Sequence, residues 1–310
     1  MSKVRLCDIE LTRPRCIQQA CEELARCKHI GRKAWAVAGC TDWMVDWNAR
    51  HVDDDCFDGL VVDISLIPEL RGIVVDGDDV SIGAAEPYSS LVQHRVIRDR
   101  CGLLSLMADG VGSPQVRSRG TLGGNLVSGS PAADGVTALF ALDADVVLRS
   151  VRGQRRIPIT SFYAGYRLSV RSEDELLERV EFRMPRPDAF QLWRKVGSRK
   201  SLAISKVSVA AIAEIDDQRV SRIGFGVASV ADRVLPLSAA RSLLLGTRIG
   251  SLSSIRVLLI DAIDREISPI DDIRSTAKYR RHVAKVLVWA FVCGLRQELD
   301  RDVSAGAGIE

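Results

Sequence analysis

Gly120-Thr121-Leu122-Gly123-Gly124-Asn125 is the segment from which the fold and function of this chain are best approached. Its three glycines leave backbone N–H groups open to close approach, because glycine has no Cβ and reaches backbone angles that other residues avoid. A pyrophosphate needs several such donors in one place. The segment lacks the GxGxxG spacing that opens a helix, so the classical dinucleotide-binding fold is disfavoured.

A second glycine-bearing turn, Ala38-Gly39-Cys40-Thr41-Asp42, follows a short apolar strand predicted at residues 35–38. We interpret the segment at 120–125 in the same way, as a turn after a short strand. Each turn could hold one side of a dinucleotide. Either turn alone is more often only a tight turn.

The small-residue stretch continues as Ser128-Gly129-Ser130-Pro131-Ala132-Ala133-Asp134. Ser130, with Pro131 at the first helical position, predicts a helix that runs to Ala141. A helix N-terminus itself favours phosphate, so a helix start and a binding role are compatible. The carboxylate of Asp134 is not explained by a helix start alone. Because residues 110–134 carry few bulky side chains, we expect this stretch to have a binding role.

Apolar periodicity along the chain predicts both helices and strands. Helices are expected at 14–27, 89–107, 238–245, 253–263 and near the C-terminus, and strands at 60–64, 178–184, 191–196, 207–215 and 219–227, with hairpins at 73–83 and 144–159. One face of the last helix is predicted to carry Val283, Val286, Leu287, Ala290, Phe291 and Gly294. Two prolines, Pro185 and Pro187, disfavour a helix or a central strand and mark a domain boundary.

Composition excludes several classes of protein. A chain of 310 residues favours two domains, and 43 basic against 40 acidic residues give a net charge too small to imply a nucleic-acid partner. The first eight residues lack the apolar run of a secretory signal, and the apolar stretch at 286–295 is far shorter than a bilayer span. We therefore expect a cytoplasmic protein with no membrane span.

The cysteines do not form a recognisable metal motif. There are eight of them, at irregular spacing: Cys7, Cys16, Cys21, Cys27, Cys40, Cys56, Cys101 and Cys293. Three of them, Cys16, Cys21 and Cys27, could be iron–sulfur ligands, but their spacing matches neither common ferredoxin pattern. Reduced, partly buried helix cysteines are the favoured interpretation, and no metal site is predicted.

Several motifs together resemble a known family. Residues 113–126, continued by 130–134, resemble the flavin-binding signature of the medium subunits of xanthine dehydrogenase and carbon monoxide dehydrogenase. In that family the first turn usually reads Ala-Gly-Gly-Thr-Asp, which residues 38–42 match except at Cys40. Segments at 165–167, 175–177, 195–199 and 272–281 also resemble the family, so the resemblance covers nearly the whole chain.

The resemblance implies an α+β fold in two domains. A p-cresol methylhydroxylase-type FAD-binding domain of two subdomains would be followed by a smaller α+β C-terminal domain with an antiparallel sheet and helices. We expect the FAD-binding domain at 1–186, with subdomains at about 1–59 and 60–186, the C-terminal domain at 187–300, and a flexible tail at 301–310.

The resemblance also implies a set of cofactor contacts. Matched position by position, the residues expected to bind FAD are Ala36, Val37, Ala38, Gly39, Cys40, Thr41, Asp42, Trp43, Thr121, Gly123, Gly124, Asn125, Ser128, Asp134, Leu177 and Lys195. Residues 36–43 would wrap the pyrophosphate and ribitol, and the backbone of Leu177 would lie beside the isoalloxazine. The ammonium of Lys195 would lie near the polar edge of the ring, where a cation stabilises the reduced form. The alternative for Lys195 is an exposed strand lysine.

Some positions depart from the family pattern. Cys40 restricts the backbone angles and brings a thiol close to the expected phosphate, Trp43 is larger than the usual aliphatic residue, and Val111 stands where some relatives have an aromatic residue. The acidic residue common in relatives is absent from 201–205. The basic run at 274–281 is either a solvated helix start or a brace between domains or subunits.

The implied activity is electron transfer within a molybdenum hydroxylase complex. FAD on this chain would take electrons from [2Fe–2S] clusters on a small subunit and pass them to NAD⁺, a quinone or O₂, while molybdopterin on a large subunit hydroxylates the substrate. A dimer of heterotrimers is expected. No group is predicted to act as a catalytic acid or base. A self-sufficient FAD-dependent oxidase or reductase, and a flavin-free scaffold subunit, are the alternatives.

Overall fold

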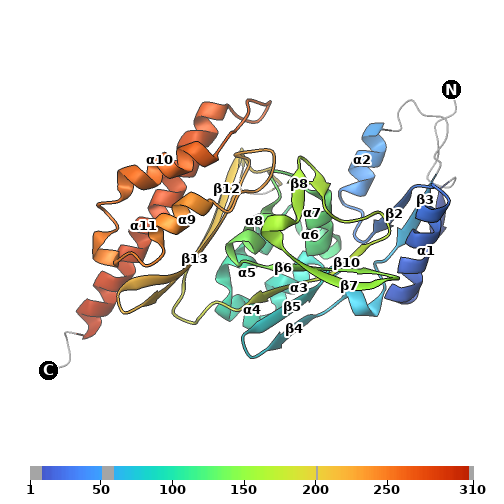
Figure 1. Cartoon of the computed structure of the whole chain (residues 1–310), viewed down its shortest axis with the longest axis horizontal. Coiled ribbons are helices and arrows are strands. Elements are labelled where there is room, and N and C mark those ends of the chain that lie inside the picture. Colours follow the sequence, from blue (N-terminus) through green and yellow to red (C-terminus); the bar gives the residue numbers. More distant parts are fainter. Residues whose placement is uncertain (1–8, 51–58, 200–201, 307–310) are drawn as a thin grey trace.

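The structure, a computed structural model, describes residues 9–50, 59–199 and 202–306. Figure 1 shows an elongated molecule with the N-terminal elements at one end, the C-terminal helices at the other, and a sheet covered by short helices between them. Within the described ranges, no helix is both long and apolar enough to cross a membrane.

The N-terminal region is a small parallel sheet with one helix packed on it. It contains β1 (Glu10–Thr12), α1 (Ile17–His29), β2 (Ala34–Val37), α2 (Trp43–Arg50) and β3 (Leu60–Asp63), and the strand order is β1-β3-β2. Helix α1 buries Ala20, Leu24 and Cys27, which recur at helical spacing, against Leu60 and Val62 of the central strand. The helix and both strands expected here are confirmed.

The middle region is a five-stranded antiparallel sheet. Its strands are β4 (Ile73–Asp76), β5 (Asp79–Gly83), β6 (Asp145–Ser150), β7 (Gly153–Pro158) and β10 (Leu176–Arg183), in the order β4-β5-β10-β6-β7. The two predicted hairpins, β4–β5 and β6–β7, are confirmed. A two-stranded ribbon, β8 (Tyr163–Gly165) and β9 (Leu168–Ser169), and short 3-10 helices at Pro68–Leu70 and Ile159–Ser161 lie nearby.

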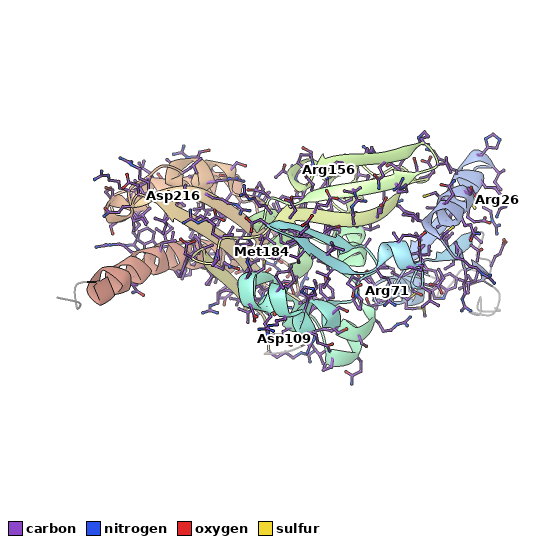
Figure 2. All side chains as sticks on the ribbon, turned by 90° about the horizontal axis from the view of Figure 1, so that it is seen from below. Arg26, Arg71, Asp109, Arg156, Met184 and Asp216 are labelled. Atoms are coloured by element: carbon purple, nitrogen blue, oxygen red, sulfur yellow. The ribbon has the colours of Figure 1, made fainter. Side chains whose placement is uncertain are left out.

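Six short helices pack with this sheet: α3 (Tyr88–Gln93), α4 (Arg95–Arg100), α5 (Gly102–Asp109), α6 (Pro114–Arg119), α7 (Leu122–Ser128) and α8 (Asp134–Ala141). Figure 2 shows Arg156 of the edge strand β7 and Asp109 at the end of α5 on opposite sides of the molecule. The side chains between the two layers form the largest apolar core.

Three expectations for these helices are wrong. The helix expected at 89–107 is divided into α3, α4 and α5, because His94 and Cys101 leave helical backbone angles. Gly120–Asn125 does not follow a strand: it lies between α6 and α7, and Leu122 begins α7 after the N-cap Thr121. The helix expected from Ser130 begins at Asp134, because the Ser130 hydroxyl accepts a hydrogen bond from the Ala132 N–H in a turn instead.

The C-terminal region pairs a three-stranded antiparallel sheet with helices. It contains β11 (Phe190–Val196), β12 (Val207–Asp216) and β13 (Arg219–Ala228), in the order β11-β12-β13, then α9 (Ser238–Leu244), a 3-10 helix (Ile249–Ser251), α10 (Arg256–Glu266) and α11 (Ala277–Gly306). The strands and helices expected here are present. Helix α11 includes the first part of the segment expected to be a tail and continues to Gly306.

The predicted buried face of α11 needs correction. Of the predicted residues, Phe291 is buried and Val283 and Leu287 pack against the core, but Val286 is 48% exposed and Ala290 is also exposed. Ala284 and Val288, which were not predicted, are buried in the same core. In a helix this rich in alanine and valine, two neighbouring rows both have apolar spacing, so periodicity alone does not identify the buried one.

Helix α8 joins the middle and C-terminal regions. A Cβ on Gly224 of β13 would lie 2.0 Å from the Ala141 carbonyl oxygen, and one on Gly226 would lie 1.9 Å from that of Thr137. The helix backbone therefore rests directly on the C-terminal sheet. Met184, the residue after β10, leads from the middle region into the C-terminal region and lies near the centre of the molecule in Figure 2.

Candidate functional site

The two glycine-bearing segments lie against each other. A Cβ on Gly39 would lie only 1.8 Å from the carbonyl oxygen of Arg119, so only glycine allows the turn after β2 to approach the start of the 120–125 segment this closely. The Ser128 hydroxyl donates a hydrogen bond to Oδ2 of Asp42 at 2.6 Å. The end of α7 is thereby tied to the first turn.

Helix α7 is seated by its small residues. The Thr121 hydroxyl accepts a hydrogen bond from the Gly124 N–H at 3.0 Å and caps the helix. A Cβ on Gly123 would lie 2.5 Å from the carbonyl oxygen of Ala84, at the end of β5. The side chain of Asn125 is also fixed, because its Oδ1 accepts a hydrogen bond from the Val136 N–H of α8.

Two adjoining cavities contain every predicted site residue. The first, of about 360 Å³, is lined by Ala36, Val37, Ala38, Gly39, Cys40, Thr41, Asp42, Trp43, Thr121, Gly123, Gly124, Asn125, Ser128 and Leu177. The second, of about 1020 Å³, is lined by Asp134 and Lys195. Asp42, Asn125 and Ser128 belong to both walls, so the cavities meet where the two glycine-bearing segments meet.

Lys195 is not the exposed strand lysine of the alternative interpretation. Its side chain is 16% exposed, and its ammonium lies 2.5 Å from Oδ2 of Asp134 and donates to the Gly110 carbonyl at 3.1 Å. Oδ1 of Asp134 accepts hydrogen bonds from the hydroxyls of Ser205 and Ser208, at 2.7 and 3.3 Å. An ammonium carries three N–H donors, so two bonds leave one donor for a molecule in the second cavity.

Two consecutive parts of the chain each match a protein family. Residues 7–186 match the FAD-binding domain in molybdopterin dehydrogenase, and residues 193–294 match the CO dehydrogenase flavoprotein C-terminal domain. The chain belongs to the FAD-binding subunits of the molybdenum hydroxylases.

Relatives of this flavoprotein subunit are similar over most of their length. The nicotinate dehydrogenase FAD-subunit of Eubacterium barkeri is 35% identical over 69% of this chain and 71% of its own. The carbon monoxide dehydrogenase medium chain of Hydrogenophaga pseudoflava is 31% identical over 74% and 78%. A solved structure of carbon monoxide dehydrogenase from the same organism has a TM-score of 0.84 at 26% identity, covering 94% of this chain and 99% of that one. The predicted α+β fold is confirmed.

Tyr88 is a residue of the candidate site that the sequence did not indicate. It is 2% exposed, lies on the wall of the first cavity, and its hydroxyl has no hydrogen-bond partner among the described residues. Burial raises the pKa of Tyr88 well above its usual value, so the hydroxyl stays protonated and can donate. A buried polar group without a partner costs about 1–3 kcal/mol, and a polar cofactor in the cavity would remove that cost.

Cys40 occupies a backbone conformation that suits glycine. Its φ is +60°, in the left-handed region, and this is where the family usually has glycine. The turn therefore keeps its shape at the expense of backbone strain of roughly 1–2 kcal/mol. Burial raises the pKa of the Cys40 thiol, with a contribution from Asp63, so the thiol adds no negative charge to the cavity wall.

The other departures from the family pattern are also visible in the cavities. Val111 lies on both walls, so no aromatic ring is present at that position. Trp43 stacks on Trp47 with ring centroids 5.3 Å apart. In the segment lacking an acidic residue, Ser205 binds Asp134 instead, whereas Ser201 lies outside the described residues.

The basic run at 274–281 is a brace within the C-terminal region rather than a wholly solvated helix start. Arg280 is 3% exposed and donates to the carbonyl oxygens of Lys206 and Ser229 and to Asp272. Although burial alone would raise it, hydrogen bonds from Arg274 and Arg280 hold the pKa of Asp272 well below its usual range. The brace fixes one side of the second cavity.

Cys16, at the N-cap of α1, and Cys21 and Cys27, within the helix, are not gathered into one cluster. No group of three potential metal ligands is found within the described ranges. Burial raises the pKa of Cys21 to about 11, so this thiol is protonated at neutral pH. Cys7 and Cys56 lie outside the described residues.

Proposed function

We propose that this subunit binds one FAD across both cavities and relays electrons from iron–sulfur clusters of a partner to an external acceptor. The observation that carries the proposal is the meeting of the two cavities at the glycine-bearing turns, where Asp42 and Ser128 are shared. The pyrophosphate would lie beside the turn after β2, because the N–H groups of residues 39–41 donate no hydrogen bond to any of the described residues. In the 120–125 segment, by contrast, every N–H group except that of Thr121 already donates a hydrogen bond within the protein. FAD would supply the redox chemistry when bound.

The proposed orientation places the AMP half in the first cavity and the isoalloxazine in the second. The reason is Lys195, whose spare N–H donor lies on the second wall and suits the polar edge of the ring. Lys195 would stabilise the negative charge that reduction places there. Leu177 lies on the first wall only. We therefore propose that Leu177 contacts the AMP half, in place of the isoalloxazine contact first expected.

The remaining site residues would hold the cofactor in place. Residues 36–43 and 121–125 would surround the pyrophosphate and its neighbouring sugar groups, and Tyr88 would donate a hydrogen bond from its unpartnered hydroxyl. Asp134 would fix the position of Lys195 through their direct pair. The proposed domain division, 1–186 and 187–300, leaves Asp134 and Lys195 on opposite sides of the boundary.

We also propose the partners and the setting. Relatives are named as medium chains or medium subunits, which supports an assembly with an iron–sulfur small subunit and a molybdenum-bearing large subunit. A dimer of such heterotrimers, an external acceptor among NAD⁺, quinone and O₂, and a cytoplasmic location complete the proposal. The six cysteines in the described ranges are free thiols, as is usual in a reducing compartment.

Two measurements test this proposal. The full chain should be purified and its visible spectrum recorded, with the released cofactor identified by mass; FAD and a flavin band near ~450 nm are expected. The native complex should then be isolated and its molybdenum and iron measured. A chain without flavin would support the scaffold alternative. Full substrate turnover by the chain alone would support the self-sufficient oxidase.

A further inference from the structure

Arg171 lies on the wall of the first cavity, in the loop between β9 and β10. Trp35, Ile64 and Leu176 line the same cavity, and none of these residues lines the second cavity. The sequence motifs did not single out Arg171. Its position would be the AMP end of the cofactor in the orientation proposed above.

The guanidinium of Arg171 is held in place but incompletely bonded. Its Nη1 donates to the carbonyl oxygens of Ser172 and Glu175, at 3.1 and 2.6 Å. Its buried Nε has no hydrogen-bond partner among the described residues. Both acceptor carbonyls belong to the same loop, so these bonds orient the planar guanidinium. They leave its other N–H donors without a partner from this pair of carbonyls.

The nearest carboxylate is already engaged elsewhere. Glu175 accepts two hydrogen bonds from Arg155, at 2.6 and 2.7 Å, and one from the Ser172 N–H at 2.8 Å. Its side chain is therefore committed to Arg155, on the outer strand β7. Burial lowers the pKa of Arg171, because no bonded carboxylate offsets the loss of hydration.

We infer that Arg171 is a specificity residue that binds the AMP half of FAD and so selects FAD over FMN. This inference rests on the proposed FAD site. Adenine nitrogens and ribose oxygens are hydrogen-bond acceptors, and a guanidinium plane also stacks on aromatic rings. Trp35, Ile64 and Leu176 of the same cavity wall offer the apolar surface that a purine needs. FMN lacks the AMP half and gains nothing from Arg171.

The test is a binding comparison on the full chain after removal of its flavin. FAD, FMN and AMP should each be titrated against the wild type, Arg171→Met and Arg171→Lys. The matched control is Arg152→Met, because Arg152 is 58% exposed, pairs with Asp174 and lies outside the described walls of both cavities. Dissociation constants are measured by calorimetry or flavin fluorescence.

The inference predicts a selective loss. Arg171→Met should weaken FAD and AMP binding about 10- to 100-fold, the range of a hydrogen bond to a charged group, and change FMN binding by less than about twofold. Arg171→Lys, which keeps the charge but loses the planar fork, should fall between wild type and Arg171→Met. The control should bind all three ligands as the wild type does.

Retained FMN binding also shows that the variant is folded. Two results would overturn the inference and leave the proposed function standing. One is that Arg171→Met weakens the binding of FAD and FMN equally, and the other is that it leaves FAD binding unchanged. A wild-type chain that binds neither FAD nor FMN would refute the proposed function itself, and the inference with it.

Discussion

The hydroxyl of Ser128 lies 2.6 Å from Oδ2 of Asp42, and this hydrogen bond links two segments that are 86 residues apart in the sequence. It joins the end of α7 to the turn after β2, at the place where the two cavities meet. The alignment of the two glycine-bearing segments therefore depends on a side-chain contact as well as on close backbone packing.

Ser128→Ala should weaken FAD binding about 10-fold, because a hydrogen bond to a charged group contributes roughly 1.5–3 kcal/mol and this exposed one lies at the low end of that range. The measurement is FAD titration of the flavin-free chain. Ser118→Ala is the matched control, since the exposed Ser118 hydroxyl of α6 donates a hydrogen bond to the Gln115 carbonyl and Ser118 lines neither cavity in the described part of the chain. Unchanged affinity in Ser128→Ala would show that the turns are aligned by their backbone alone.

Cys40→Gly should raise the thermal stability of the chain. Removing the left-handed strain at φ +60° gains roughly 1–2 kcal/mol, of which the greater freedom of glycine in the unfolded chain offsets a part. A rise in Tm of about 1–3 °C is expected by calorimetry. Cys40→Ala separates the causes, because it removes the thiol and keeps the strain. A similar gain in both variants would contradict this explanation.

Lys195→Gln should make the flavin harder to reduce. Glutamine can still bond to Asp134, but the positive charge is lost, so the charge added on reduction is less stabilised. We expect the midpoint potential to fall by on the order of 30 mV, which is ~1.4 kcal/mol for a two-electron couple. Spectroelectrochemical titration measures it. Lys206→Gln, whose ammonium lies over the ring of Tyr279, is the control and should leave the potential unchanged.

Asp174 should contribute a pH-dependent part of the stability. The hydrogen bond from Arg152, helped by Lys28 at 2.7 Å and opposed by burial, lowers the pKa of Asp174 from 3.8 to about 2. A lowered folded-state pKa means that the stabilisation is present above pH 3.8 and is lost as the pH falls through about 2. Because Arg152 is largely exposed, we expect the ionised Asp174 to stabilise the fold by only about 1 kcal/mol.

The comparison that checks this is Tm against pH for the wild type and Asp174→Asn. The difference between them should be constant from neutral pH to about pH 5 and should shrink toward zero near pH 2. Asp99→Asn, which changes an exposed carboxylate of α4, should show no such pattern. A difference that persists at the lowest pH would assign the effect to packing rather than to charge.

The hairpins and the three-stranded C-terminal sheet could be predicted from the sequence, because their alternation and turn residues are local signals. Helix α7 could not. Its two glycines disfavour a helix, and it is stabilised by the cap at Thr121 and by the packing of Gly123 against Ala84. The cap is a local contact, but the packing of Gly123 against Ala84 joins segments that are distant in the sequence.

The site could be predicted only in part, for a related reason. Every residue named from the resemblance lines one of the two cavities. Tyr88 and Arg171 were missed, because an unpartnered buried donor is a property of the folded surroundings. No short pattern around either residue distinguishes it from an ordinary core tyrosine or a surface arginine.

The contact of α8 with Gly224 and Gly226 has a consequence for how this fold can be divided. An engineer who transplanted residues 1–186 alone into a chimeric reductase would uncover the side of α8 that now rests on β13, and would leave Asp134 without Lys195. A larger residue at either glycine would separate the same surfaces within the intact chain. The cofactor module and the C-terminal sheet are therefore expected to be exchangeable between relatives only as one piece.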